Sequence, residues 1–415
     1  MANFEGDLTG LSEKQLNFIE NVIEKRGYVN PKVTVQPLGR AGDNYIAIVK
    51  RITVEENGET LKIVAKVAPV IEDLRNTMQT KEVFYNEHVV YTELLPKFTE
   101  LEIEAEIPKK ERLRYAVCFG SLDEEPNEII LLEDLQEPGF TLLDRFKALQ
   151  NDQMKLIIEN IAKLHALSFA LKNKEPETFG KIRNKLYNSR LHMGKEPTTK
   201  HFLNHIENQF LDLLVEEKYK QAIKGKISGM DGLLGKLHKA DKDSKHLVIQ
   251  QGDCWTNNVM FRLQDENVVE CCMIDYQFAC ANLPVDDVYQ VLFNCSDYDS
   301  RAKHFQEWLD YYHMYFTKYL YHFGLKADNV YSKEQFESDM IRYGKFALGQ
   351  AAFSSSFLLK NDEDAEKMKS AMDSGITELT DEMLKELTSS GSSSMVKLKT
   401  RLEELVDSFI ELGYL

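Results

Sequence analysis

The most informative stretch of this 415-residue chain is Gln250-Gln251-Gly252-Asp253-Cys254-Trp255-Thr256-Asn257-Asn258. It places a carboxylate, Asp253, and an amide, Asn258, five residues apart in a segment that reads as a loop. Short apolar runs follow at 259–261 and 268–274, so we expect a β-hairpin there. The second run leads into Asp275, which puts another carboxylate at the far end of the hairpin.

This arrangement of Asp253, Asn258 and Asp275 suits phosphoryl transfer. That reaction requires a protein to orient the acceptor hydroxyl, to hold metal against the nucleotide phosphates and to neutralise charge. Asp253 can accept the hydroxyl proton, while Asn258 and Asp275 offer the hard oxygen ligands that Mg²⁺ prefers. Each piece alone occurs by chance in many chains, but their order and their loop–hairpin context favour the functional interpretation.

The chain ahead of this stretch reads as a small sheet with one long helix. We expect strands at 45–54 and 60–67, joined by a turn at Asn57-Gly58, because both turn residues tolerate positive φ. The other elements expected here are a helix at 11–25, a helix at 76–95 that Pro96 ends, and strands at 115–121 and 129–132.

Lys66 is the candidate cation of this sheet. It lies near the end of the second strand among apolar residues, where a charge is costly unless something pairs with it. Glu87, on the following helix, is the natural partner. The alternative is that Lys66 extends to solvent and Glu87 lies on an exposed helix face.

Two further segments fit a nucleotide site. Gly42 and Asn44 belong to a glycine-containing turn that can bring backbone N–H groups close to phosphates, although any turn can have this composition. Glu133 to Leu135 falls where the sheet passes into helices, and the backbone there can hydrogen-bond an adenine. The alternative for this segment is a plain linker.

Past residue 135 the apolar spacing is mostly helical. The stretches concerned are 142–171, 201–238, 301–360 and an amphipathic closing helix near 396–410. We therefore expect an α+β protein with an N-terminal nucleotide-binding lobe at 1–135. The C-terminal helical lobe, at 136–415, would carry the catalytic loop and the substrate site.

Composition excludes several classes of partner. Acidic residues number 67 and basic residues 51, and the resulting net charge of −16 repels a phosphate backbone or an anionic membrane. No segment approaches the ~18 apolar residues that a membrane span needs. The six cysteines form no Cys-x-x-Cys pair, which indicates a reduced compartment. We expect a cytoplasmic protein that binds neither nucleic acid nor membrane, with no obligate protein partner.

A set of motifs in consistent order carries a family resemblance. They are Gly42-Asp43-Asn44-Tyr45, the strand with Lys66, Phe84-x-x-Glu87-x-x-x-Tyr91-x-x-x-x-Pro96, Leu132-Glu133-Asp134-Leu135, Leu164-His165-Ala166-x-Ser168, Gly252-Asp253-x-Trp255-x-x-Asn258-x-Met260-Phe261, Ile274-Asp275-Tyr276-Gln277 and Pro284-x-x-Asp287. The set resembles the protein-kinase-like fold in its small-molecule branch, near aminoglycoside phosphotransferases and choline kinases. It is most similar to the ecdysteroid kinase-like (CHK kinase-like) family of insects.

The resemblance implies a bilobal fold with ATP between a small antiparallel sheet lobe and a large helical lobe. The implied roles are Asp253 as catalytic base, Asn258 and Asp275 as Mg²⁺ ligands, Lys66 as the phosphate contact oriented by Glu87, and Glu133 to Leu135 as the adenine hinge. It also implies transfer of the γ-phosphoryl group to a hydroxyl of a small apolar acceptor such as an ecdysteroid. Choline-like and xenobiotic alcohols stay open as acceptors.

One residue departs from the family pattern. The family usually has His where this chain has Gln251. That His braces the loop, and a Gln amide can also donate and accept hydrogen bonds, so we expect activity to be retained. A catalytically weakened, pseudokinase-like binding or regulatory protein is the alternative. His165 and Asp287 are expected to be structural, with Asp287 capping a helix or bracing the catalytic loop.

Overall fold

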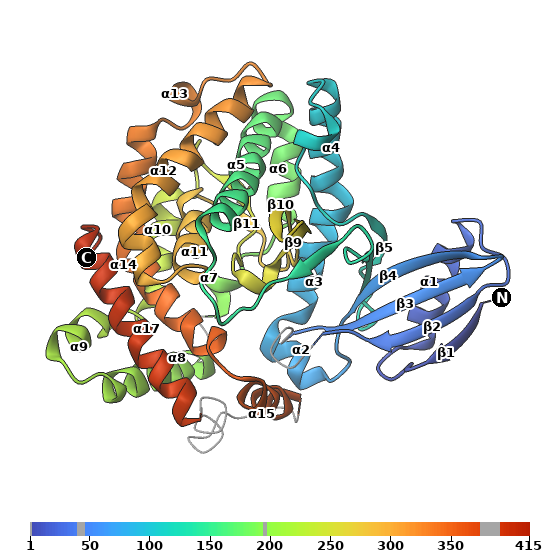
Figure 1. Ribbon diagram of the computed structural model, residues 1–415, viewed down its shortest axis with the longest axis horizontal. Coiled ribbons are helices and arrows are strands. Elements are labelled where there is room, and N and C mark those ends of the chain that lie inside the picture. The colour runs from blue at the N-terminus through green and yellow to red at the C-terminus, as the bar shows by residue number, and fades with distance from the viewer. Residues whose placement is uncertain (1, 40–45, 194–196, 374–390) are drawn as a thin grey trace.

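The computed structural model describes residues 2–39, 46–193, 197–373 and 391–415. Within these ranges the chain forms a small lobe built on one sheet and a larger lobe of packed helices (Figure 1). The α+β class and the two-lobed, kinase-like arrangement expected from the sequence are therefore confirmed. The lobe boundary at residue 135 stays a prediction.

The small lobe contains a six-stranded sheet in the order β1-β2-β3-β4-β6-β5. Its strands are β1 (Asn3–Gly6), β2 (Lys32–Pro37), β3 (Ile48–Glu56), β4 (Glu59–Val67), β5 (Cys118–Leu122) and β6 (Ile129–Glu133). β1 and β2 are parallel and every other pair is antiparallel. The expected hairpin turn is confirmed, because Asn57 and Gly58 have φ values of 53° and 85° between β3 and β4.

The alternation of β4 determines where Lys66 points. Ile63, Ala65 and Val67 are fully buried in a core that includes Ile19 of α1 (Glu13–Glu24). Successive side chains of a strand point to opposite faces, so Lys66 lies on the other face of the sheet. That face is turned toward the helical lobe.

The helical segment after β4 differs from the expectation. It consists of α2 (Glu72–Met78), α3 (Thr80–Val89), a π-helical segment (Val90–Leu94) and α4 (Leu95–Glu104). The expectation that Pro96 ends a helix is wrong, because Pro96 lies in the first turn of α4. A proline is tolerated there, and the π turn before it, closed by the Leu95 N–H donating to the Val90 carbonyl, changes the hydrogen-bond register.

The large lobe is arranged around α5 (Asn151–Lys174), which is buried along most of its length and packs against α12. The other helices are α6 (Pro176–Lys185), α7 (Ser189–Met193), α8 (Pro197–Leu213), α9 (Glu217–Ile223), α10 (Met230–Asp241), α11 (Val285–Asn294), α12 (Tyr298–Tyr321), α13 (Ala327–Val330), α14 (Lys333–Leu358), α15 (Asp362–Asp373) and α17 (Ser392–Glu411). In the described ranges, no helix is both long and apolar enough to cross a lipid bilayer.

Two small sheets interrupt the helices of the large lobe. One contains β7 (Phe140–Leu142), β9 (Val259–Gln264) and β10 (Asn267–Met273), and the other pairs β8 (Val248–Gln250) with β11 (Cys280–Asn282). The pairing of β9 with β10 confirms the expected hairpin. These sheets lie beside the small lobe in Figure 1, and the loops that join them form the site.

Candidate functional site

Lys66 is held between two carboxylates. Its Nζ atom lies 2.5 Å from Oε2 of Glu87 on α3 and 2.6 Å from Oδ1 of Asp275, which follows β10. Lys66 is only 6% exposed, so the alternative in which it extends to solvent is wrong. Burial opposes its charge, but Asp275 and then Glu87 raise the pKa of Lys66 above its ordinary value, so the amine is an ammonium.

Asp275 adopts an unusual backbone conformation, with φ at 61°. A non-glycine residue rarely occupies this left-handed region, and it persists only where the surroundings hold it. Here the next N–H, of Tyr276, donates to Oε1 of Glu87 at 3.2 Å. Glu87 thus binds Lys66 with one oxygen and the backbone after Asp275 with the other.

The loop after β8 depends on Gly252. Its φ is 84°, and a Cβ atom added there would lie 2.2 Å from the carbonyl oxygen of Phe278. Only glycine lets the two backbone segments approach this closely. The next residue, Asp253, therefore emerges from the loop close to the segment that carries Asp275.

Asn258 joins Asp253 to the hairpin. Its Nδ2 atom donates to the backbone carbonyl of Asp253 at 2.9 Å and to Oδ2 of Asp253 at 2.8 Å. The Asn258 carbonyl accepts from the Ile274 N–H at 2.9 Å. The loop and the end of the hairpin are thereby fixed to each other, which brings Asp253, Asn258 and Asp275 into one cluster.

The environment of Asp253 is suited to proton transfer. Burial and then the negative charge of Asp275 raise the pKa of Asp253 to about 7, although hydrogen bonding to Asn258 and the charge of Arg190 oppose the change. A general base works best when its pKa lies near the working pH. The carboxyl group of Asp253 can therefore exchange a proton with a bound hydroxyl near neutral pH.

Gln251 connects the two loops through its side chain. Its Nε2 atom donates to the carbonyls of Ile274 at 3.0 Å and Asp275 at 2.8 Å, while Oε1 accepts from the Asp253 N–H at 2.6 Å. An amide can donate two hydrogen bonds and accept others at once. Gln251 is thus a brace between the Asp253 loop and the Asp275 segment.

Asp287 braces the same loop, as expected. Its two carboxylate oxygens accept the N–H groups of Gln251 and Gly252, each at 2.9 Å. His165, fully buried on α5, bridges Oδ2 of Asp287 at 3.2 Å and the hydroxyl of Tyr312 at 2.8 Å. Both side chains are fully buried and their hydrogen bonds go to the loop backbone, to each other and to Tyr312, which fits the expected structural role.

An ion pair behind the Asp253 loop, between Arg190 and Asp286, was not predicted from the sequence. Nη2 of Arg190, on α7, lies 2.5 Å from Oδ2 of Asp286, and Nε2 of Gln250 donates to the same oxygen at 2.8 Å. Asp286 is 1% exposed and directly precedes Asp287. Two adjacent acidic residues in an apolar helix were a usable signal, but the sequence holds no sign that α7 supplies their partner.

Glu133 to Leu135, the predicted adenine hinge, lie at the end of β6 and in the segment that follows it. The N–H of Glu133, at the end of β6, donates to the Val117 carbonyl at 2.8 Å, and its side chain pairs with Arg114 at 2.7 Å. Leu135 is buried and its carbonyl accepts from the Phe140 N–H at 2.9 Å. Their assignment to a base-binding hinge stays a prediction.

The two residues expected to contact phosphates, Gly42 and Asn44, lie outside the described residues. Of the predicted site, the structure therefore brings together five residues from four separate segments. They are Lys66, Glu87, Asp253, Asn258 and Asp275.

The donor set fits a hard divalent cation. Because Nδ2 of Asn258 is turned to Asp253, its Oδ1 atom has no hydrogen-bond partner among the residues that the structure describes. Lys66 contacts only Oδ1 of Asp275, which leaves the second carboxylate oxygen for a ligand. Carboxylate and amide oxygens, completed by waters and phosphates, are the usual ligands of Mg²⁺.

Comparisons with known proteins identify a family for this chain. The model of the ecdysteroid kinase-like family matches residues 41–325. No curated protein matches the chain.

Solved structures similar to this chain include two phosphotransferases and a kinase. They are the GDP complex of a mutant aminoglycoside 2'-phosphotransferase-IIIa (11% identity, 96% of this chain and 99% of that chain, TM-score 0.45), Plasmodium vivax ethanolamine kinase (14%, 95% and 89%, 0.41) and spectinomycin phosphotransferase APH(9)-Ia with ADP and spectinomycin (11%, 94% and 98%, 0.40).

Proposed function

The chain belongs to the ecdysteroid kinase-like family, and we propose that it transfers the γ-phosphoryl group of ATP to a hydroxyl of a small molecule. The observation that carries the proposal is the contact of Lys66 with Glu87 and Asp275 beside the Asp253–Asn258 pair. It gathers a cation for phosphates, two candidate metal ligands and a base with a pKa near 7 in one place.

In the proposed mechanism each of these side chains has one role. Asp253 accepts the proton of the acceptor hydroxyl as its oxygen attacks the γ-phosphorus, and the bond from that phosphorus to the bridging oxygen of ADP breaks. Lys66, oriented by Glu87, compensates the charge of the α- and β-phosphates. Asn258 and Asp275 would hold Mg²⁺, which neutralises phosphate charge when bound.

Gln251 favours an active enzyme over a weakened, pseudokinase-like binding protein. The Gln251 amide makes the hydrogen bonds that join the Asp253 loop to the Asp275 segment, so the two segments keep their positions relative to each other. The base and the metal ligands are also retained. We therefore treat the replacement of His as a change of brace and not as a loss of the site.

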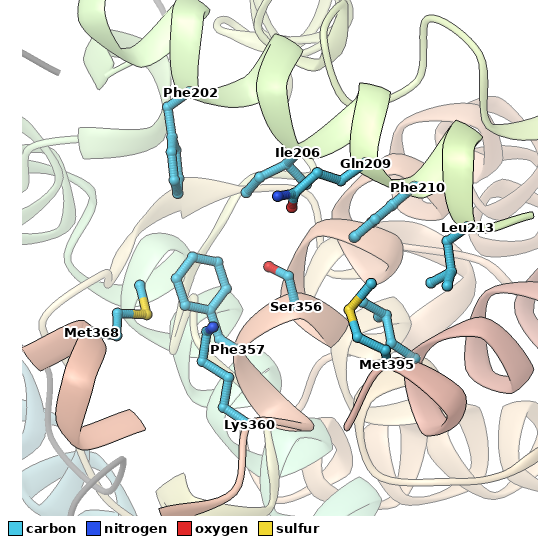
Figure 2. Close-up of a pocket in the computed structure, with 11 residues that line it drawn as sticks. Phe202, Ile206, Gln209, Phe210, Leu213, Ser356, Phe357, Lys360, Met368 and Met395 are labelled. Atoms are coloured by element: carbon cyan, nitrogen blue, oxygen red, sulfur yellow. The ribbon is translucent and has the colours of Figure 1, made fainter. Parts of the chain in front are cut away.

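We propose an apolar alcohol, such as an ecdysteroid, as the acceptor. Figure 2 shows a pocket between α8, α14, α15 and α17 whose walls are mostly apolar, with Phe202 and Phe210 facing Phe357 and Met395. Its side chains leave room for little more than a water molecule, about 20 Å³. A steroid would therefore bind here only after side chains around the pocket move apart, and Met368 and Met395 have the unbranched, flexible side chains that move most easily.

The pocket is linked to the site by α14. Ser356 lines the pocket, and Gln350 lies six residues earlier on the same helix, which is about 9 Å along its axis. In the orientation that satisfies its neighbours, the Gln350 amide donates to Oδ1 of Asp286 at 3.3 Å. The helix that lines the apolar pocket therefore also contacts Asp286, which lies behind the Asp253 loop.

The test is a transfer assay with purified protein, Mg²⁺ and γ-labelled ATP. The acceptors are neutral steroid polyols, choline and ethanolamine, and xenobiotic phenols and alcohols. We expect label in an organic product of the steroid class, formed about 10²–10⁴-fold more slowly when Asp253→Asn replaces the wild type. Label in the choline class would replace the acceptor assignment. Absence of transfer to every class, with nucleotide binding intact, would favour the binding protein.

A further inference from the structure

Asn86, the residue before Glu87 on α3, is fully buried beside the site. Its Nδ2 atom donates to the Tyr187 carbonyl at 2.8 Å and to the Gln277 carbonyl at 3.1 Å. Its Oδ1 atom accepts from the Tyr187 N–H at 2.7 Å. Both donors and one acceptor site of the amide are therefore used, and they reach two segments of the large lobe.

Asn86 and Glu87 together hold the segment that follows Asp275. Glu87 accepts the N–H of Tyr276, and Asn86 donates to the carbonyl of the next residue, Gln277. Two adjacent side chains of one helix thus bind consecutive residues of this segment. A positive φ is uncommon even for an aspartate, so the conformation of Asp275 persists because its surroundings support it.

The partner of Asn86 also reaches the catalytic loop. Tyr187 lies just before α7, and Arg190 on α7 forms a two-pronged ion pair with Asp286, at 2.5 and 3.4 Å. Asp286 in turn accepts from Gln250, the residue before Gln251. Residues 187–190 therefore connect Asn86 of the small lobe, through Asp286, to Gln250, where the loop that carries Asp253 begins.

We propose that Asn86 is a positioning residue that sets the Asp275 carboxylate for a magnesium-bound nucleotide. It touches neither nucleotide nor metal and acts through the backbone of Gln277. Its bond to Tyr187 links this setting to α7, one of the helices α6 to α10 that lie between α5 and β8 in the chain. This inference rests on the proposed function, because it presupposes that Asp275 meets a metal.

The test compares nucleotide affinity with and without magnesium, by calorimetry on the purified full chain. Wild-type protein is expected to bind ATP more tightly with Mg²⁺ than with EDTA. Asn86→Ala is expected to lose about tenfold or more of the affinity in Mg²⁺, the usual effect of losing a group that orients a metal ligand. Its affinity in EDTA is expected to stay at the wild-type value.

Asn160→Ala is the matched control. Asn160 is also a buried asparagine whose Nδ2 makes two bonds, to the Leu156 carbonyl at 3.1 Å and to Sγ of Cys271 at 3.0 Å, but it lies on α5. This variant is expected to keep the magnesium effect. Asn86→Asp is a second variant of the same size that keeps the acceptor for Tyr187 and loses both donors.

The outcomes separate the two proposals. A wild-type protein that binds no nucleotide in Mg²⁺ would contradict the proposed function itself. A wild-type magnesium effect that is unchanged in Asn86→Ala would overturn only the role of Asn86. Failure of both Asn86 variants to fold would overturn it as well, because it would assign Asn86 to the stability of the fold.

Discussion

Lys66 and Asp275 meet across the two lobes, with Nζ of Lys66 2.6 Å from Oδ1 of Asp275, although the two residues are 209 positions apart in the chain. Glu87 occupies another side of the same ammonium, at 2.5 Å. A nucleotide with its metal would engage both Lys66 and Asp275, so it would use groups that already hold the lobes together. Ligand binding and the contact between the lobes are therefore expected to be linked.

Removal of Asp275 is expected to abolish the stabilisation by Mg-ATP. A ligand that binds only the folded state stabilises it, by about 1.4 kcal/mol at a tenfold excess over Kd, so Mg-ATP should raise the melting temperature of the wild type. Asp275→Ala keeps the pairing of Lys66 with Glu87 and should fold. Thermal scans at millimolar Mg-ATP measure this difference. An equal shift in the variant would exclude Asp275 from the metal site.

Neutralising Asp253 is expected to separate catalysis from binding. Asp253→Asn should lower turnover by about 10²–10⁴-fold, the usual contribution of a general base, with nucleotide affinity nearly unchanged. Turnover by phosphoryl transfer and affinity by calorimetry give the two values. The control is Asp265→Asn, in the exposed turn between β9 and β10, which should leave both at the wild-type level. Wild-type turnover in Asp253→Asn would remove the residue from this role.

Local patterns predicted the loop, the hairpin and the strand with Lys66, because apolar alternation and turn residues act over a few positions. Asn86 and Arg190 could not be predicted from the sequence. Their partners, Gln277 and Asp286, lie about a hundred or more positions away, and the pairing depends on the tertiary arrangement of α3, α7 and α11. A polar residue in a helix gives no sign of such a distant partner.

In the helical segment after β4, a strong local signal gave a wrong prediction. The sequence contains Pro96, a strong signal for the end of a helix, but the chain accommodates it at the start of α4 after a π-helical segment. The packing of Phe98 and Leu101 into the core keeps the segment helical beyond the proline. Tertiary contacts outweighed a local preference there.

The wild-type reaction is expected to depend on pH through Asp253. Its pKa is raised to about 7, so below that pH the carboxyl is protonated and cannot accept the hydroxyl proton. The value of kcat/KM for the nucleotide reports the free enzyme and should fall about tenfold per unit below about pH 7. The residual rate of Asp253→Asn should lack this limb. A flat wild-type profile from about pH 5.5 to 8 would contradict the assignment.

Gln251→His is expected to keep or increase activity near neutral pH. A neutral imidazole can accept from the Asp253 N–H with one nitrogen and donate to the Asp275 carbonyl with the other, as the amide does. Below about pH 6 the ring becomes a cation that only donates, and the bond from Asp253 is lost. The pH profiles of the two proteins should therefore diverge in acid.

A variant without hydrogen-bonding groups completes this comparison. Gln251→Leu has a similar size and should be slow at every pH, because it leaves the Ile274 and Asp275 carbonyls unpaired. If Gln251→His is inactive at neutral pH while it remains folded, Gln251 has a role that bracing does not describe. Equal activity of Gln251→Leu would contradict the bracing role altogether.

Two glycines with nearly the same φ separate backbone strain from crowding. Gly58 has φ of 85°, and among the described residues no heavy atom from outside the turn lies within 4 Å of an added Cβ, while Gly252 has φ of 84° and the Phe278 oxygen at 2.2 Å. Gly58→Ala should lower the free energy of unfolding by about 1–2 kcal/mol from the left-handed conformation alone. Gly252→Ala should lower the free energy of unfolding by about 1–3 kcal/mol more than Gly58→Ala does, because the added Cβ overpacks the contact with Phe278. Denaturant titrations measure both values.

The functional effect should divide in the same way. Gly58 lies at an exposed hairpin turn of the small lobe, whereas Asp253 lies in a loop of the large lobe. Gly58→Ala should therefore keep wild-type turnover in the folded protein. Relief of the contact with Phe278 in Gly252→Ala requires the loop to shift, and that shift moves the neighbouring Asp253 by a comparable distance. Misplacement by about 1 Å can lower a rate by about 10²-fold. Equal stability and turnover in the two variants would show that the close approach at Gly252 does not position the base.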